Sequence, residues 1–267
     1  MNGNKVLYER RGDIALLTLN DPDRRNALSR EIVRGLSRAL NTALDEGVRA
    51  VVIAAAGPAF CAGANIEDLR DGWMECPHPD EDPAVMFKRI AEFDRPVVAA
   101  VHGAALGGGM ELTLACDLVV AADSAWFSMP ELGHGVIPNT GLALLPRVVG
   151  MRRAFEMIFT RRRMSAEEAL DIGLVNRVLP GDQVREGALS LAEQIVGSVP
   201  PGALKAAKLN LHAHAAIDWS RVLRSPLDVP KQEWQEGLTA FTEKRAPEYG
   251  RFWKEIKHQI KGASLDN

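Results

Sequence analysis

Three consecutive glycines, Gly107–Gly109, lie in the middle of the segment from residue 102 to 117, and Glu111 follows one helical turn later. An apolar, strand-like run at residues 96–101 comes before the glycines, and a helix-compatible run follows them. Glycine backbone at such a junction lets amide N–H groups approach a ligand closely, and N–H groups at a helix N-terminus favour negative charge. The segment therefore places candidate donors for a developing anion beside a candidate acid or base.

The glycines could instead have a purely structural role. They could serve only the tight packing of a strand against a helix, with Glu111 as a solvated acid in the first helical turn, where the helix dipole favours it. A nucleotide-binding loop is disfavoured, because no Lys-Ser/Thr pair is present and Leu112 occupies the place of the third glycine of a dinucleotide fingerprint. On this segment alone, the packing role stays open.

Apolar patterning before the segment predicts strands and helices in alternation. Val6–Arg10 and Ile14–Leu19 flank a Gly-Asp pair and indicate a β-hairpin. Ser29 is a candidate N-cap for a helix that continues to residue 44, with apolar residues at four-residue spacing. Val51–Ala54 is predicted to be a buried strand.

The same unit recurs after residue 96. The apolar run is predicted to be a strand, followed by a glycine turn, a helix at Gly109–Ala115, and strands at Leu118–Ala122 and Trp126–Ser128. The polar stretch from residue 69 to 86 is expected to form a long loop. Strands and helices that alternate in this way predict an α/β fold.

Helical patterns dominate from Met151 onward. Ser165 and Glu168 form a capping-box pattern at the start of one helix. Residues 184–196 and 203–212 are amphipathic, and residues 234–241 form the last candidate helix.

Composition narrows the class of protein. The chain has 267 residues, 46% of them hydrophobic, and a net charge of −3 with dispersed basic residues, so we expect no nucleic-acid surface. The basic cluster Arg161–Arg163 is expected to be a solvated helix end. Cys61, Cys76 and Cys116 are too few for a disulfide framework and indicate a reducing compartment. No signal peptide and no apolar run of membrane-spanning length is visible, so a cytoplasmic protein without membrane contact is expected.

Five short motifs resemble one family when taken together. Phe60–Ile66 resembles F-x-A-G-A-D-I, the glycine segment resembles an oxyanion-hole signature, and Met129–Pro138 resembles M-P-E followed by G-x-x-P. Leu19–Leu28 and Phe241–Arg245 match at the two ends. The motifs occur in family order over roughly residues 5 to 250 and resemble the crotonase superfamily, the enoyl-CoA hydratase/isomerase proteins.

The resemblance implies a fold and an assembly. It implies a crotonase-like spiral of strand-strand-helix turns over residues 1–195 and a C-terminal helical trimerisation region over residues 196–267. It also implies a homotrimer or a dimer of trimers. The ligand would be an acyl-CoA thioester of fatty-acid metabolism, with no separate cofactor or metal, because coenzyme A is part of the substrate.

The implied chemistry passes through a thioester enolate. By motif match, the backbone N–H groups of Ala64 and Gly108 would hold the thioester oxygen. Glu111 and Glu131 match the two acid/base glutamates of the family's hydratases, and burial is expected to raise their pKa values.

Further positions are expected at the ligand. The coenzyme A portion would contact Arg25, Ala27, Ala62 and Ile66, and its adenine end would contact Phe241 and Lys244, from the same or a neighbouring subunit. The remaining positions expected at the substrate are Asn65, Leu106, Gly107, Pro130 and Asn139.

Two departures from the family pattern bear on the reaction. Asn65 replaces the usual Asp, and Asn139–Ala143 replaces a glycine-rich run where a backbone group holds the catalytic water. If the N–H of Asn139 takes over that role, its side chain is free to shape the pocket. Because both glutamates are present, we expect an enoyl-CoA hydratase. The alternatives are a double-bond isomerase, an acyl-CoA dehydratase, a hydratase-lyase, or a non-catalytic CoA-binding protein.

Overall fold

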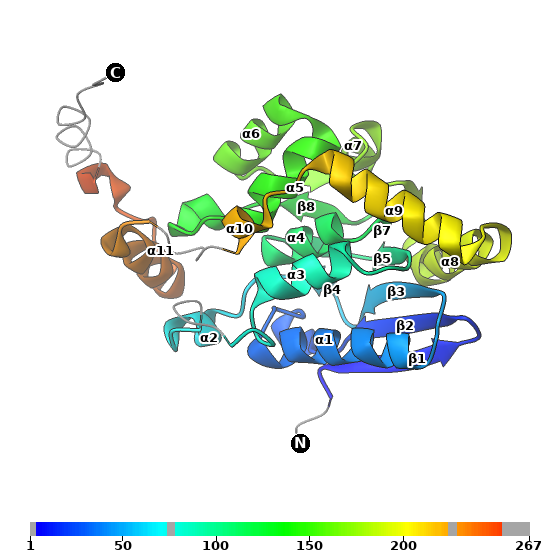
Figure 1. Ribbon diagram of the computed structural model, residues 1–267. Coiled ribbons are helices and arrows are strands. Elements are labelled where there is room, and N and C mark those ends of the chain that lie inside the picture. The colour runs from blue at the N-terminus through cyan, green and yellow to red at the C-terminus, as the bar shows by residue number, and fades with distance from the viewer. Residues whose placement is uncertain (1–3, 74–77, 224–228, 253–267) are drawn as a thin grey trace.

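The computed structural model describes residues 4–73, 78–223 and 229–252, and it confirms the predicted α/β fold (Figure 1). Its main sheet has six strands in the order β1-β2-β3-β5-β7-β10. These strands are β1 (Val6–Arg11), β2 (Ile14–Leu19), β3 (Ala50–Ala55), β5 (Val97–Val101), β7 (Leu118–Ala122) and β10 (Arg177–Leu179). In this sheet the β1–β2 hairpin is antiparallel, and the other four pairings are parallel. The predicted hairpin is therefore confirmed.

A second sheet of four strands lies beside the first, in the order β4-β6-β8-β9. Its strands are β4 (Ala59–Cys61), β6 (Ala104–Leu106), β8 (Trp126–Ser128) and β9 (Met164–Ser165). Three of them directly follow a strand of the main sheet, since β4 follows β3, β6 follows β5 and β8 follows β7. Each pair then leads into a helical segment, so the predicted spiral of strand-strand-helix turns is confirmed.

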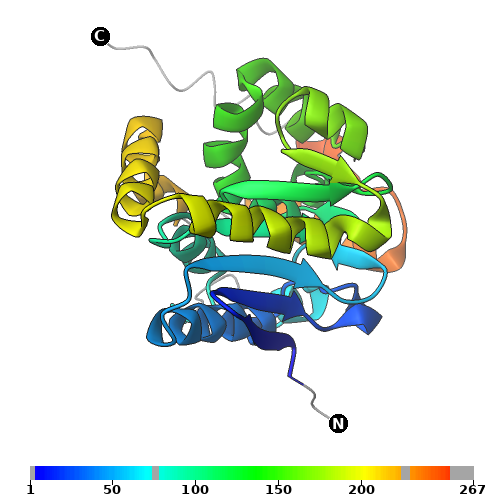
Figure 2. The same ribbon diagram turned by 90° about the vertical axis from the view of Figure 1, so that its right-hand side faces the viewer.

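Helices cover both sheets. They are α1 (Arg30–Asp45), α2 (Ile66–Arg70), α3 (Pro83–Ala91), α4 (Gly108–Ala115), α5 (Asn139–Val149), α6 (Met151–Thr160), α7 (Ala166–Asp171), α8 (Val184–Ser198), α9 (Pro201–Ala215), α10 (Trp219–Val222) and α11 (Lys231–Glu243). Short 3-10 turns occur at η1 (Pro22–Arg24), η2 (Glu131–His134), η3 (Gly181–Gln183) and η4 (Tyr249–Arg251). Helix α8 packs across β3, β5 and β7, and Figure 2 shows it crossing the sheet.

The central strands are fully buried. All residues of β3 and β5 are shielded from solvent, which explains why both are continuous apolar runs rather than alternating patterns. Ser29 caps α1 as predicted, because its hydroxyl accepts a hydrogen bond from the N–H of Ile32 at 3.3 Å. Ser165 likewise caps α7 through the N–H of Glu168 at 3.2 Å.

The predicted long loop at residues 69–86 is wrong in part. Helix α3 already begins at Pro83, because the carboxylate of Asp82 accepts the N–H of Ala84 at 2.8 Å and caps the helix. Cys76, which belongs to the same stretch, lies outside the described residues.

Helix α5, which contains Pro146, was not predicted. It forms because Leu144 and Leu145 are buried and the helix packs against α4. The predicted division after residue 195 falls inside α8, and residues 253–267 of the second part lie outside the described ranges. That division stays a prediction.

Candidate active site

The glycine run occupies the junction of β6 and α4. Gly107 has φ +52° and ψ −122°, a conformation that residues with a side chain rarely adopt. Its N–H donates to the carbonyl of Ser128 at 2.9 Å, which ties the junction to the end of β8. A Cβ at Gly107 would lie 2.5 Å from Oε1 of Glu131. Glycine is therefore required here by the backbone conformation and by the approach of a carboxyl group.

Two backbone N–H groups lie near each other at this junction. Leu28 donates to the carbonyl of Gly63 at 2.7 Å and accepts from the N–H of Asn65 at 2.7 Å. Successive residues of an extended chain face opposite ways, so the N–H of Ala64 between them points away from Leu28. A Cβ at Gly108 would lie 3.9 Å from the nitrogen of Ala64.

The N–H of Gly108 is also without an intrahelical acceptor, because Gly108 is the first residue of α4. Over residues 4–73, 78–223 and 229–252, neither this N–H nor that of Ala64 donates a hydrogen bond to the protein. Two such donors in close proximity can bind one oxygen that carries negative charge.

Glu111 lies on the inner side of α4 and is 8% exposed. Its Oε1 accepts a hydrogen bond of 2.8 Å from the N–H of Gly141, in the first turn of α5. Burial raises the pKa of Glu111 to about 7, while hydrogen bonds from Gly141 and Thr140 oppose the rise. Glu111 is therefore a carboxylate with a pKa suited to take up or release a proton near neutral pH.

Glu131, at the start of η2, has a different environment. Both of its carboxyl oxygens are shielded from solvent, and among the described residues neither has a hydrogen-bond partner. Burial, followed by the negative charge of Glu111, raises the pKa of Glu131 well above its usual range. The site thus combines one carboxyl whose pKa is raised to about 7 with a second whose pKa is raised well above its usual range. Pairs of carboxyl groups whose surroundings separate their pKa values are a mark of acid/base catalysis.

The structure shows what the backbone N–H of Asn139 does. The N–H of Asn139 donates to the carbonyl of Ile137 at 3.0 Å, so it is not the free donor that the sequence suggested for holding water. Asn139 itself begins α5 and is half-buried. The residue whose N–H reaches the carboxylate of Glu111 is Gly141, which the sequence analysis did not single out. No helix was predicted at this position, and only the packing of α5 against α4 brings Gly141 to Glu111.

Asn65 serves as a helix cap. It is buried, and its Oδ1 accepts hydrogen bonds from the N–H groups of Glu67 at 2.9 Å and Asp68 at 3.2 Å at the start of α2. Asn and Asp are both favoured N-cap residues, so the replacement of Asp keeps this local structure. The oxygen of Asn65 is occupied by the helix rather than presented to a ligand.

The remaining predicted substrate positions are half-buried or exposed. Ala27, Ala62, Ile66 and Leu106 are each half-buried, and Ala62 donates to the carbonyl of Arg25 at 3.1 Å. Arg25 is exposed, with φ +51°. Pro130 directly precedes Glu131 as the N-cap of η2.

The two C-terminal positions lie on α11 and at its end. The ring of Phe241 is 50% exposed and meets His134 of η2 edge to face, with ring centres 5.0 Å apart. Lys244 ends α11 with φ +55° and is exposed. Phe241 therefore reaches the loop of Glu131 within one chain.

The prediction that the basic cluster is a solvated helix end is confirmed, because Arg161 ends α6, with φ +56°, and is exposed. The cluster also contacts neighbouring elements. The guanidinium of Arg161 lies against Gly133, and that of Arg163 lies 4.1 Å from the ring centre of Trp126. Charge alone gave no signal of these contacts, which arise because α6 ends beside η2 and β8.

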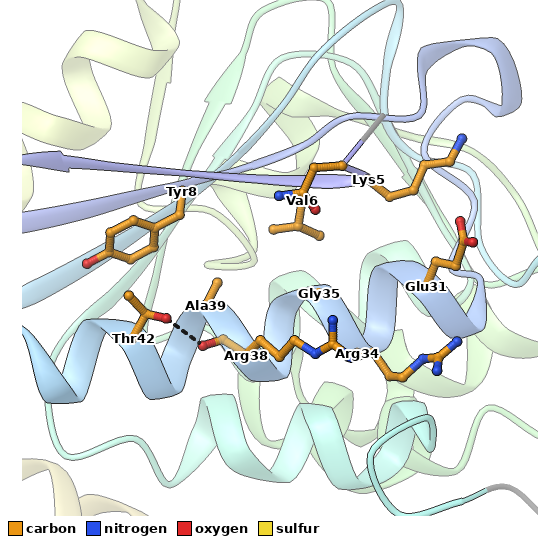
Figure 3. Close-up of a pocket in the computed structure, with 10 residues that line it drawn as sticks. Lys5, Val6, Tyr8, Glu31, Arg34, Gly35, Arg38, Ala39 and Thr42 are labelled. Atoms are coloured by element: carbon orange, nitrogen blue, oxygen red, sulfur yellow. Dashed lines mark hydrogen bonds between the residues drawn. The ribbon is translucent and has the colours of Figure 1, made fainter. Parts of the chain in front are cut away.

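Two further features involve none of the predicted site residues. Cys61 is buried, and burial raises the pKa of its thiol to about 12, which agrees with a packing role. A groove of about 440 Å³ lies between β1 and α1, lined by Lys5, Arg34, Arg38 and neighbouring residues (Figure 3). It contains none of the predicted site residues.

The described residues contain no group of three His, Cys, Asp or Glu side chains arranged to hold a metal. None of the described helices is long and apolar enough to cross a membrane.

Comparisons with known proteins agree with the geometry. A family model described as enoyl-CoA hydratase/isomerase matches residues 9–252. A probable enoyl-CoA hydratase of Rhizobium meliloti is 36% identical over 261 residues, covering 93% of this chain and 99% of that protein. A carnitinyl-CoA dehydratase of Salmonella typhi is 37% identical, covering 89% of this chain and 95% of that protein.

A solved structure gives the same result for the fold. The crystal structure of an enoyl-CoA hydratase/isomerase from Pseudoalteromonas atlantica matches with a TM-score of 0.83 at 32% identity, covering 92% of this chain and 100% of that chain. The resemblance noted in the sequence is confirmed, and the chain belongs to the enoyl-CoA hydratase/isomerase family of the crotonase superfamily.

Proposed function

We propose that this protein is an enoyl-CoA hydratase, which adds water reversibly to the double bond of a trans-2-enoyl-CoA. The observation that carries the proposal is the unlike pair of buried carboxyl groups, Glu111 and Glu131, beside two unpaired N–H groups. Double-bond isomerisation needs only one acid/base, whereas hydration gives a task to each carboxyl.

The two N–H groups stabilise the intermediate. Attack at the β-carbon pushes electrons onto the thioester oxygen and produces an enolate. The N–H groups of Ala64 and Gly108 bind that oxygen, and each donor contributes about 3 kcal/mol in comparable oxyanion holes. A side chain at position 108 would crowd this space, since a Cβ there would lie 2.9 Å from Cδ1 of Leu28.

The two glutamates divide the proton transfers. Glu111, whose ionised form is stabilised by the N–H of Gly141, takes a proton from water as the hydroxyl adds to the β-carbon. Glu131, neutral because of burial, gives its proton to the α-carbon. A proton shift from Glu111 to Glu131 then restores the starting state, and the reverse sequence removes water.

The substrate's coenzyme A portion binds at the half-buried and exposed positions near the two N–H groups. In this proposal Arg25, Ala27, Ala62 and Ile66 hold coenzyme A, and Phe241 and Lys244 face its adenine end. Asn65, Leu106, Gly107, Pro130 and Asn139 surround the thioester and acyl group, with Asn65 acting through the start of α2. The reaction as written requires no separate cofactor or metal.

A homotrimer or a dimer of trimers in the cytoplasm completes the proposal. An exposed apolar stripe supports association, because Met151, Phe155 and Phe159 follow one another at four-residue spacing on α6 and are 59%, 51% and 64% exposed. The free, buried thiols of Cys61 and Cys116 are consistent with a reducing compartment. Light scattering of the wild type and of Phe155→Glu tests the assembly, and a monomeric wild type would reject it.

The activity test uses trans-2-enoyl-CoA substrates of graded acyl length, together with carnitinyl-CoA for the reverse dehydration. Loss of the conjugated thioester absorbance, with the product alcohol identified by mass spectrometry, is the expected result. Exchange of α-protons with deuterated solvent without any alcohol would reject hydratase and favour an isomerase. Absence of both turnover and exchange would leave a CoA-binding protein.

A further inference from the structure

We propose that the C-terminal segment Lys231–Phe252 holds the loop that carries Glu131, and that Tyr249 is a positioning residue for this carboxyl group. The inference rests on the proposed function for the role of Glu131, but the contacts do not depend on it. It assigns to α11 and η4 a part in the reaction that is separate from binding coenzyme A.

Glu131 needs support from outside its own loop. Its side chain has no hydrogen-bond partner among the described residues, and η2 is a four-residue 3-10 turn. Within the loop, the N–H of Val136 donates to the carbonyl of Glu131 at 3.1 Å, and Gly135 adopts φ +67°. Such short turns have poor hydrogen-bond geometry. What packs against the loop therefore decides where the carboxyl lies.

Helix α11 packs on this loop at two glycines. A Cβ at Gly135 would lie 2.7 Å from Cα of Trp234, and a Cβ at Gly237 would overlap the carbonyl of His134. The ring contact between Phe241 and His134 continues the same interface. The backbone of α11 and that of the loop thus approach so closely that neither glycine could carry a side chain without a shift.

Tyr249 adds a directional contact. Its hydroxyl donates to the carbonyl of Gly133 at 2.9 Å, and the guanidinium of Arg161 lies against the same glycine. Burial and the nearby charge of Glu236 raise the pKa of Tyr249, so the hydroxyl remains a donor at neutral pH.

The segment after α11 is itself anchored. Glu236 accepts the N–H of Glu248 at 2.8 Å and pairs with Arg245 at 2.6 Å, which fixes η4 to α11.

Helix α11 also reaches the second half of the site. Arg70, at the end of α2, donates to the hydroxyl of Thr242 on α11. Helix α2 begins two residues after Ala64, whose N–H is a proposed oxyanion donor. Figure 1 shows α2 and α11 at the same end of the molecule. One helix therefore connects the proton donor to the structure that supports the oxyanion donor.

A pair of glycine variants of the full chain tests this inference. Gly237→Ala places a methyl group against the carbonyl of His134, whereas Gly197→Ala in α8 places the same group in open space. We expect amide hydrogen exchange at residues 131–136 to accelerate only in Gly237→Ala. Its kcat should fall by about 10²-fold, because a displacement of about 1 Å at the reacting centre can cost that much. KM should change little.

The pH profile provides a readout that general destabilisation would not move. Water that enters a loosened loop stabilises the charged form of Glu131, so the alkaline limb of kcat should shift to lower pH in Gly237→Ala. Unchanged exchange at residues 131–136, or faster exchange with wild-type kcat and pH profile, would overturn the inference.

A pair of tyrosine variants covers the case in which Gly237→Ala fails to fold. Tyr249→Phe removes only the hydroxyl. Tyr8→Phe, on β1, removes a comparable hydroxyl, which donates to Glu46 at 2.7 Å. We expect a decrease in kcat of about 5-fold for Tyr249→Phe, as one lost hydrogen bond allows, and none for Tyr8→Phe. Equal kcat values for Tyr249→Phe and wild type would refute its positioning role. If wild type hydrates no enoyl-CoA, the proposed function fails, while the exchange data still decide whether the segment holds the loop.

Discussion

Replacing Gly107 with alanine tests two requirements at this position, a strained backbone conformation and space for the carboxyl group of Glu131. Its backbone conformation costs an L residue about 1–3 kcal/mol, so the free energy of unfolding should fall by at least that amount. The new Cβ would also lie 2.5 Å from Oε1 of Glu131, although ordinary van der Waals contact begins at 3.4 Å. The carboxyl oxygen must then move by about 1 Å, and a displacement of that size can lower kcat by about 10²-fold.

Gly150→Ala is the matched control for this change. Gly150 has φ +82° and ψ 155°, so alanine is strained there too, but its Cβ would meet nothing within 4 Å. Urea unfolding should show comparable losses of stability in both variants. Initial rates, followed at the conjugated thioester absorbance, should fall only in Gly107→Ala. Equal loss of kcat in the two variants, or full activity in a folded Gly107→Ala protein, would refute the argument that this glycine makes room for Glu131.

Three further predictions follow from the same geometry. Glu111→Gln and Glu131→Gln should each lower kcat by about 10²–10⁴-fold with the fold intact by circular dichroism, and a near wild-type rate in either would reject the two-glutamate mechanism. The pKa of Glu111 is raised to about 7, so kcat should decline as pH falls through about 7, when the base becomes protonated. Because this pKa is raised above its unfolded value, the contribution of Glu111 to stability is present at low pH and is lost as pH rises through about 7. The urea midpoint of the wild type should therefore fall as the pH rises to about 7, and the midpoint of Glu111→Gln should fall less. Asn139→Gly should change the relative kcat/KM among acyl lengths with a modest loss of hydration, since Gly141 rather than Asn139 holds Glu111; a loss as large as that of Glu111→Gln would contradict this assignment.

The sequence predicted a feature correctly where that feature depends on neighbouring residues in the chain or on residue type. The hairpin at β1–β2, the cap at Ser29 and the glycine junction before α4 follow from patterns within a few residues, and each is confirmed. It failed where packing overrides a local signal. No helix was predicted over α5, which contains Pro146, and the three-residue strands β4 and β6 were also missed, although β8 of the same length was predicted.

By itself, the sequence determined the order of the motifs, the presence of both glutamates and the family that they indicate. Only the tertiary structure decided how the two carboxyl groups differ. Glu111 meets the N–H of Gly141 because α4 and α5 pack together, whereas Glu131 is enclosed without any hydrogen bond from the described residues by a loop that α11 covers. The protonation of a buried carboxyl depends on its solvation and on charges and donors that arrive from distant parts of the chain. No spacing of residues along one segment contains that information.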